Sequence, residues 1–138
     1  MPSTPHILAP GILVSPQVSP DDLADLAGAG VRVLVSHRPD GEEPGQPSAH
    51  NMAGAAAAAG LRFVHIPVSG MPDAAAVSQT ADVLKTLGTG EAILMFCRSG
   101  TRSTVAWALA MRALGRGEPD ELRAAAAAAG YDLSRLPL

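Results

Sequence analysis

Cysteine is nearly absent from this chain of 138 residues, and aromatic side chains and long apolar runs are also scarce. A single cysteine cannot form an internal disulfide, so its thiol is free, as is usual in a reducing compartment. No apolar run approaches the ~20 residues of a membrane-spanning helix. The start, MPSTPHILAPG, lacks the charged residues and apolar stretch of a signal peptide. We therefore expect a cytoplasmic protein with no membrane partner.

An excess of positive charge is missing as well. The chain has 10 Lys and Arg against 13 Asp and Glu, which gives a net charge of -3 and excludes a broad electrostatic grip on nucleic acid. No two of His6, His37, His50 and His65 have the spacing of metal ligands. We therefore expect no metal, no other cofactor and no nucleic-acid partner.

Short apolar runs, often β-branched, alternate along the chain with alanine-rich stretches that begin with helix-capping residues. The apolar runs predict strands over residues 12–14, 31–35, 61–68 and 92–96. Helices are predicted to start at Ser19, Ser48 and Asp73, near Arg102 and at Pro119. Because alternating strands and helices build parallel sheets, we predict a single α/β domain over residues 1–138. Its mainly parallel central sheet should have four to five strands, with helices on both faces.

The segment CRSGTRS (97–103) directly follows the apolar run AILMF, at the carboxyl end of a predicted buried strand. Ligands of open α/β sheets bind at that edge. A thiol becomes a good nucleophile when it ionises. The backbone N–H groups of a tight loop and of a helix N-terminus stabilise both a thiolate and a bound oxyanion. Cys97 is therefore the predicted nucleophile.

The neighbours of Cys97 suit such a loop. Gly100 permits the positive φ of a curled backbone, and Arg102 offers a planar fork of donors for an oxyanion. Arg98 adds positive charge, and the Ser103 hydroxyl can donate to the thiolate. An inert buried cysteine is the alternative, but it would not explain so many polar and basic neighbours. The predicted anion-binding residues of this loop are Arg98, Ser99, Gly100, Thr101, Arg102 and Ser103.

A second polar loop follows the strand predicted over 31–35 and should reach the same edge. Arg38 could help to hold an anion there, and Asp40 is a candidate general acid. Glu42 and Glu43 could orient an arginine or be solvated. The alternative is ordinary turn chemistry, because Pro-Asp-Gly is a strong turn signal.

The loop CRSGTRS resembles the active loops of two groups of thiol enzymes, rhodanese-type sulfurtransferases and cysteine-dependent phosphatases. Most of the chain also resembles the phosphatase-like domain of beta-lactamase-hydrolase-like proteins, the domain of unknown function 442. The segments that carry this likeness are RPDGEEPGQPS (38–48), LRFVHIPV (61–68), CRSGTRS (97–103) and AGYDLSRL (129–136). The resemblance implies a fold like the dual-specificity phosphatases. It also implies sulfur chemistry, because members occur fused to, or encoded beside, sulfide-oxidising enzymes.

The number of residues between Cys97 and Arg102 helps to distinguish sulfur transfer from phosphate-ester hydrolysis. Phosphatases of this type have five residues between cysteine and arginine, often with a histidine before the cysteine. Here four residues separate Cys97 from Arg102, and Phe96 precedes the cysteine. The shorter loop resembles the rhodanese type, and its smaller ring of donors suits a persulfide better than a phosphoryl group. We therefore predict a sulfurtransferase that takes sulfur from thiosulfate, a persulfide or a polysulfide and passes it to a thiol acceptor.

A cysteine-dependent phosphatase that acts on a phosphoester is the alternative. It would use the same Cys97 and Arg102, together with a general acid. Asp73, which ends the sequence SGMPD after the third predicted strand, is a candidate for the acid and equally for a helix cap. A thiol redox sensor is a third hypothesis, because exposed, readily ionised thiols oxidise easily.

Overall fold

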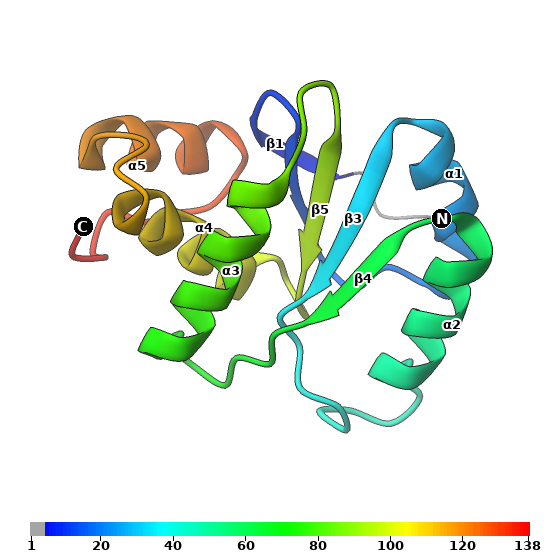
Figure 1. Cartoon of the computed structure of the whole chain (residues 1–138). Helices are drawn as coiled ribbons and strands as arrows, with labels where there is room; N and C mark the ends of the chain where they lie inside the picture. The colour runs from blue at the N-terminus through cyan, green and yellow to red at the C-terminus, as the bar shows by residue number, and fades with distance from the viewer. Residues whose placement is uncertain (1–4) are drawn as a thin grey trace.

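The computed structural model describes residues 5–138 and is built around a five-stranded sheet (Figure 1). The strands are β1 (His6–Ala9), β2 (Ile12–Ser15), β3 (Val31–Ser36), β4 (Arg62–His65) and β5 (Ala92–Phe96). They lie in the order β1-β2-β5-β3-β4, and all neighbours are parallel except β1 and β2. The predicted α/β class and mainly parallel sheet are therefore confirmed.

Two strands differ from the prediction. The antiparallel β1 was not predicted, because four residues between two prolines are too few to show a pattern. The run predicted as one strand over 61–68 is a strand only over Arg62–His65. Pro67 has no N–H for a sheet ladder, so the last part of that run continues as a loop.

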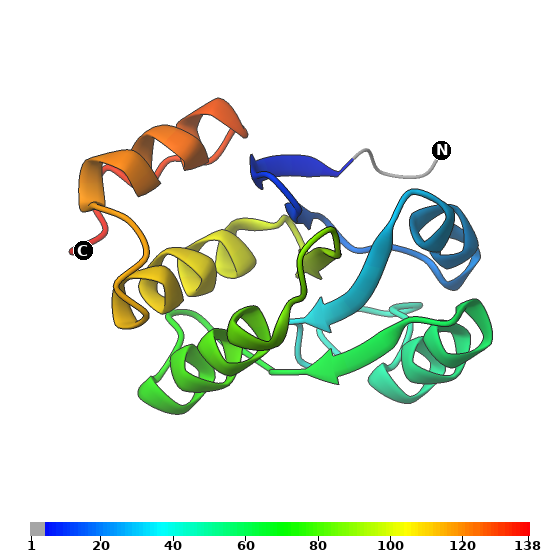
Figure 2. The ribbon, with the colours of Figure 1, turned by 45° about the horizontal axis from the view of Figure 1, so that its top comes forward.

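Helices cover both faces of the sheet (Figure 2). One face carries α1 (Leu23–Gly28), preceded by the 3-10 turn η1 (Pro20–Asp22), and α2 (Ala49–Ala59). The other carries α3 (Ala74–Thr86) and α4 (Thr101–Ala113), with α5 (Pro119–Ala128) against α4 and β1. Alternate residues of β5 therefore enter different cores, Ile93 and Met95 the α3–α5 core and Leu94 and Phe96 the α1–α2 core. This explains why β5 is apolar throughout.

Two helices start at side-chain caps that the sequence predicts. The Ser48 hydroxyl accepts a hydrogen bond from the Asn51 amide at 3.0 Å, which begins α2. The Asp73 carboxylate accepts one from the Ala76 amide at 2.8 Å, which begins α3. Each cap satisfies an N–H group that has no partner inside the helix.

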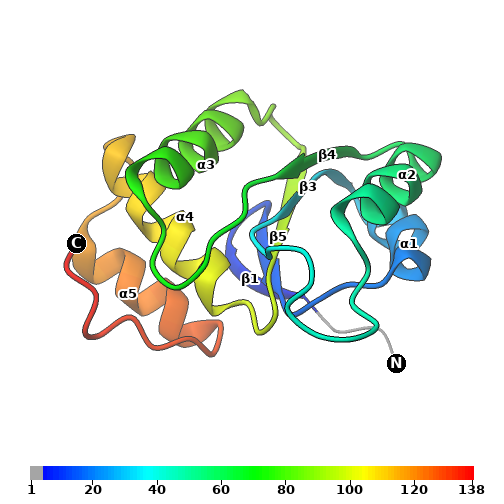
Figure 3. The ribbon, with the colours of Figure 1, turned by 90° about the horizontal axis from the view of Figure 1, so that it is seen from below.

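The register of the parallel strands places their carboxyl ends at one level. Ser15 of β2 and Ser36 of β3 both pair with Phe96 of β5, and Ser36 also pairs with His65 of β4. The segments after these strands therefore emerge together at one edge of the sheet, which Figure 3 shows from below. Those segments are residues 16–19, 37–48, 66–73 and 97–100, and they hold the predicted site residues that precede α4.

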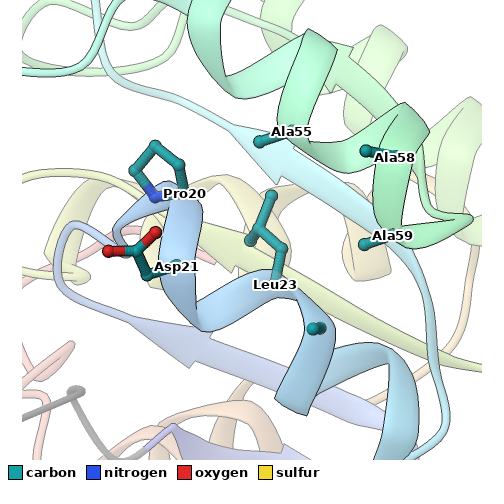
Figure 4. Close-up of a pocket in the computed structure, with 7 residues that line it drawn as sticks. Pro20, Asp21, Leu23, Ala55, Ala58 and Ala59 are labelled. Carbon is teal, nitrogen blue, oxygen red and sulfur yellow. The ribbon is translucent and has the colours of Figure 1, made fainter.

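A shallow hollow of about 390 Å³ lies elsewhere, between α1 and α2 (Figure 4). Small alanine side chains of α2 face Pro20, Asp21 and Leu23 across it. The hollow shares no residue with the Cys97 loop, and its one charged group, the Asp21 carboxylate, has no basic partner in the lining. It therefore results from packing alanine-rich helices and contributes nothing to the site described next.

Candidate active site

Cys97 lies at the end of β5, beneath the N-terminus of α4. The residue is fully buried, and its Sγ accepts a hydrogen bond from the Gly100 amide at 3.1 Å. Gly100 has φ 95°, which turns the backbone sharply into α4. Its carbonyl then accepts from the amide and the hydroxyl of Thr104, at 3.0 and 2.8 Å. The loop thus presents an N–H group and the positive end of a helix dipole to the sulfur.

The remaining polar side chains of the loop point in different directions. The Ser99 hydroxyl donates to Thr101 Oγ1 at 3.0 Å and accepts from the Thr101 amide at 3.3 Å, so these two side chains are paired at the surface. The Arg98 side chain is 68% exposed and reaches only Glu43, at 3.9 Å. Ser103 faces inward and is fully buried. Of the loop side chains, only Arg102 therefore combines a positive charge with partial burial.

Arg102 is held by the carboxylate of Glu42. Two guanidinium nitrogens donate to the two Glu42 oxygens, both at 2.8 Å, and Nη1 also donates to the Val68 carbonyl at 2.7 Å. These hydrogen bonds to Arg102, and secondarily those to Arg38, lower the pKa of Glu42 to about 2, despite the opposing effect of burial. Glu42 is therefore an anion throughout the neutral and mildly acidic range and fixes the guanidinium plane.

The buried guanidinium of Arg38 holds the two glutamates of the loop after β3, Glu42 and Glu43, in place. The Arg38 side chain is only 1% exposed. It donates to Glu42 at 2.9 Å, to Gln17 at 3.0 Å and to Glu43 at 2.8 Å. All three guanidinium nitrogens therefore bind protein oxygens, and the anions beside Arg38 in this structure are the two glutamates. Its expected role in holding a substrate anion stays a prediction.

Tyr131, which follows α5, also contacts the loop. Its hydroxyl donates to the Ser99 carbonyl at 3.0 Å. In the sequence this tyrosine stands out only as part of the family-like segment AGYDLSRL (129–136). No local pattern connects it with a loop 32 positions earlier. It is thus one of the residues beside Cys97 that the sequence did not single out.

His37, the first residue after β3, is the second such residue. It is fully buried, with Nδ1 2.8 Å from Ser103 Oγ and Nε2 3.0 Å from Thr80 Oγ1. Burial, and then the charges of Arg102 and His65, lower the pKa of His37 to about 4. His37 is therefore neutral at physiological pH and joins α3 to the first turn of α4. In the sequence, only its position directly before Arg38, after a predicted strand, indicated that His37 lies near the site.

The candidate general acids are both bound to helix N-termini. Asp73 caps α3, as described above, and Asp40 accepts from the Ala49 amide of α2 at 2.8 Å. Both residues are exposed. The loop that carries Asp73 starts beside Val68, whose carbonyl binds Arg102, so this carboxylate lies in a segment joined to the site. Its role as an acid stays a prediction.

The buried neutral His37 predicts a pH-dependent loss of stability. Its folded-state pKa, about 4, lies below the ordinary 6.5, so the unfolded chain takes up the proton first. This contribution is complete above pH 6.5 and is lost as the pH falls towards 4, at up to about 1.4 kcal/mol per pH unit. Urea unfolding over this range should show the slope in the wild type and a flatter one in His37→Gln. His50→Gln, at an exposed position, is the control and should keep the slope; a wild-type slope in His37→Gln would contradict this account.

Within residues 5–138, no helix is long and apolar enough to cross a membrane.

Comparison with known proteins identifies the family. Residues 6–115 match the family model described as the phosphatase-like domain of beta-lactamase hydrolase-like protein. The chain is 36% identical, over 125 residues, to a beta-lactamase hydrolase-like protein of Xylella fastidiosa. The match covers 90% of this chain but 28% of that protein, so the chain spans little more than a quarter of the relative's length.

Solved structures of phosphatases share the fold. A candidate phosphatase from Neisseria meningitidis is 29% identical with a TM-score of 0.78, over 93% of this chain and 89% of the other. The kinase-associated phosphatase, with its catalytic cysteine replaced by serine, is 17% identical with a TM-score of 0.72, over 89% of this chain and 80% of the other. At that identity the likeness concerns the fold alone.

The prediction of a sulfurtransferase is wrong. The family is described as phosphatase-like, and phosphatases are the structural relatives. Loop length misled because the shorter loop still brings Arg102 beside the cysteine. The pKa of Arg102 is raised, first by its hydrogen bonds to Glu42 and then by the charge of a Cys97 thiolate. The sulfur donors and the thiol acceptor were predicted only as part of the sulfurtransferase reaction, so they have no support either.

The resemblance to the domain of unknown function 442 is confirmed. The family model covers most of the chain, and a relative with the same description aligns over 90% of it. The described residues also form the sheet and helices of the dual-specificity phosphatase fold that the resemblance implies. The chain belongs to the family of phosphatase-like domains of beta-lactamase hydrolase-like proteins.

Proposed function

We propose that a single domain over residues 1–138 hydrolyses small anionic phosphate esters, with Cys97 as nucleophile and Arg102 as the phosphoryl-binding residue. The observation that carries this proposal is the Arg102–Glu42 pair, which holds a guanidinium beside a thiol at a helix N-terminus. Membership of a phosphatase-like family supports it. So does the fold shared with a phosphatase whose catalytic residue is a cysteine.

The reaction has two displacements at phosphorus. The Cys97 thiolate attacks the phosphorus atom, the bond to the ester oxygen breaks, and the leaving oxygen takes a proton from a general acid. A water molecule then attacks the phosphocysteine, the sulfur–phosphorus bond breaks, and inorganic phosphate leaves with the thiolate restored. One proton of that water returns to the carboxylate that served as the acid, the water oxygen ends on inorganic phosphate, and no electron transfer is involved.

The two edges of the Arg102 guanidinium have different partners. The hydrogens on Nη1 go to Glu42 and to the Val68 carbonyl, and one on Nη2 goes to Glu42. Nε–H and the second Nη2 hydrogen are left for phosphoryl oxygens. Backbone N–H groups of residues 98–103 would complete the ring of donors, and Arg98 adds positive charge at its exposed rim. Because Glu42 binds one edge, the other is presented in a fixed orientation.

Asp73 is the general acid in this proposal. The segment from Val68 to Asp73 starts at the Arg102 contact, so it could place a carboxyl group near the leaving oxygen. Asp73 also caps α3 through one oxygen, which leaves the other free of that bond. Asp40 is the alternative acid, with one oxygen likewise bound to an α2 amide.

Hydrolysis of a generic aryl phosphate by the purified protein tests the proposal. We expect phosphate release that vanadate inhibits in competition with the ester, because vanadate resembles the five-coordinate phosphorus of both steps. A second arm compares Asp73→Asn with the wild type on esters of increasingly basic leaving groups, and the deficit of the variant should grow along the series. Phosphate release that is insensitive to vanadate would contradict the phosphocysteine route, and an equal deficit on all esters would exclude Asp73 as the acid.

A further inference from the structure

The chain that follows α5 returns to the loop around Cys97. Figure 3 shows the turn after α5 next to the segment that leads into α4. At this turn the Tyr131 amide donates to the Ala126 carbonyl at 2.8 Å, which ties the tyrosine to the end of α5. Its hydroxyl donates to the Ser99 carbonyl at 3.0 Å. Tyr131 lies outside residues 6–115, the range of the family match, and the proposed reaction does not use it.

The Ser99 carbonyl and the Gly100 amide belong to one peptide group. In a trans peptide the C=O and the N–H point in opposite directions, and the group is planar. Here the carbonyl end accepts from Tyr131 at 3.0 Å, and the amide end donates to Cys97 Sγ at 3.1 Å. Rotation of this peptide would break both hydrogen bonds together. A donor that holds the carbonyl therefore also fixes the direction of the N–H group.

The close approach of Tyr131 depends on Gly100. A Cβ atom built on Gly100 would overlap the tyrosine hydroxyl and would lie 2.8 Å from Cζ. The phenol is thus seated directly on the backbone of the loop. Burial, and then the charge of a Cys97 thiolate, raise the pKa of Tyr131, so its hydroxyl stays a proton donor at neutral pH.

We propose that Tyr131 is a positioning residue, whose hydroxyl holds the Ser99–Gly100 peptide so that the Gly100 N–H stabilises the Cys97 thiolate. A polarised carbonyl also makes the N–H at the other end of the same peptide a stronger donor. A contribution of this contact to catalysis rests on the proposed phosphatase function. Its effect on the ionisation of the Cys97 thiol does not depend on that function.

Other charged groups around the sulfur set the background for a test. Arg102 of α4 lies beside Cys97, and Glu42 of the loop after β3 partly offsets its charge. The His37 imidazole is hydrogen-bonded to Ser103 of the loop and is neutral at physiological pH, since its pKa is lowered to about 4. None of these groups hydrogen-bonds to the Tyr131 hydroxyl, so a change at Tyr131 should leave them in place. The titratable ring that packs against Tyr131 itself is His6 of β1, edge-on with the ring centroids 5.6 Å apart, and Tyr131→Phe keeps the ring that it contacts.

Tyr131→Phe keeps the ring and removes only the hydroxyl. We expect the pH midpoint of thiolate formation to rise by roughly half a pH unit. It is followed by the ultraviolet absorbance of the thiolate, corrected with the matching Cys97→Ser protein. Since Cys97 is the one cysteine of the chain, the signal has a single source. Arg123→Met is the control, because Arg123 holds the same C-terminal segment through the Leu136 carbonyl at 2.9 Å without touching the loop. An unmoved midpoint in Tyr131→Phe, or an equal rise in Arg123→Met, would overturn the proposal.

A second measurement avoids any Tyr131 variant. The chain has one tyrosine, so its ultraviolet titration reports on residue 131 alone. Cys97→Ser should lower the phenol pKa relative to the wild type, because the neighbouring thiolate is lost. An unchanged phenol titration would overturn the proposal. Neither titration uses a phosphate ester, so a protein without phosphatase activity could still show both shifts, and an active phosphatase could show neither.

Discussion

Cys97→Ser is expected to abolish phosphate release, with a loss on the order of 10⁴-fold or more, because a serine hydroxyl in this loop has no adjacent base to ionise it. His37, the histidine behind the loop, faces Ser103 and Thr80 and not Cys97. The ion pair in which Glu42 binds one edge of the Arg102 guanidinium stays intact. The variant should therefore bind phosphate or vanadate while it fails to turn over.

The measurement is a steady-state assay on an aryl phosphate, with thermal unfolding of both proteins beside it. Cys97 is fully buried, serine matches its shape closely, and the Gly100 amide can donate to the serine oxygen. Ser134→Ala, at an exposed position near the C-terminus, is a control for handling and should keep full activity. A Cys97→Ser protein within tenfold of the wild-type rate would show that the hydrolysis does not pass through this thiol.

The parts of the fold that follow from local chemistry could be predicted from the sequence. Ser48 and Asp73 are polar residues placed directly before alanine-rich stretches, and each caps the helix that follows. The apolar run 92–96 is a strand buried on both faces. Its position directly before CRSGTRS locates the thiol at the ligand-binding edge. These features depend on neighbours within a few positions along the chain, and so the sequence shows them.

The sequence suggested that Glu42 and Glu43 could orient an arginine, but which residues pair inside the site could not be predicted in the same way. Glu42 and Arg102 are 60 positions apart, and His37 and Ser103 are 66 apart. They meet because β3 and β5 lie side by side with Ser36 opposite Phe96, a register that no local pattern contains. Arg38 was expected to hold a substrate anion because it follows a strand. That role stays a prediction, but the same register buries Arg38 and brings its guanidinium to Glu42, Glu43 and Gln17, contacts that no local pattern indicates.

The choice of chemistry failed for a related physical reason. Counting the residues between Cys97 and Arg102 measures the ring of loop amides, but the arginine belongs to the first turn of α4. Its guanidinium position depends on that helix and on Glu42, which the loop length does not describe. A short loop is therefore compatible with a phosphoryl-binding arginine.

Arg102→Lys is expected to lower kcat/KM by about 10²–10³-fold, although the positive charge is kept. The guanidinium binds both oxygens of Glu42 at 2.8 Å with one edge and keeps further N–H groups for the substrate. A lysine ammonium is a point charge without two edges, so it cannot pair with Glu42 and present a planar fork to a phosphoryl group at the same time. The loss should fall mainly on kcat, because the missing donors act most strongly on the charge that develops in the transition state.

Arg98→Lys provides the matched comparison, since it makes the same chemical change four positions earlier in the same loop. The Arg98 side chain is 68% exposed, and its contact with Glu43 is 3.9 Å long, so its contribution is largely screened by solvent. We expect less than a threefold change in kcat/KM for Arg98→Lys. Glu42→Gln should lie between the two, because the amide still accepts one hydrogen bond from Arg102 but no longer pairs with its charge. Equal effects of Arg98→Lys and Arg102→Lys would mean that the site responds only to overall positive charge. In that case the Glu42-oriented guanidinium would not be the phosphoryl-binding group.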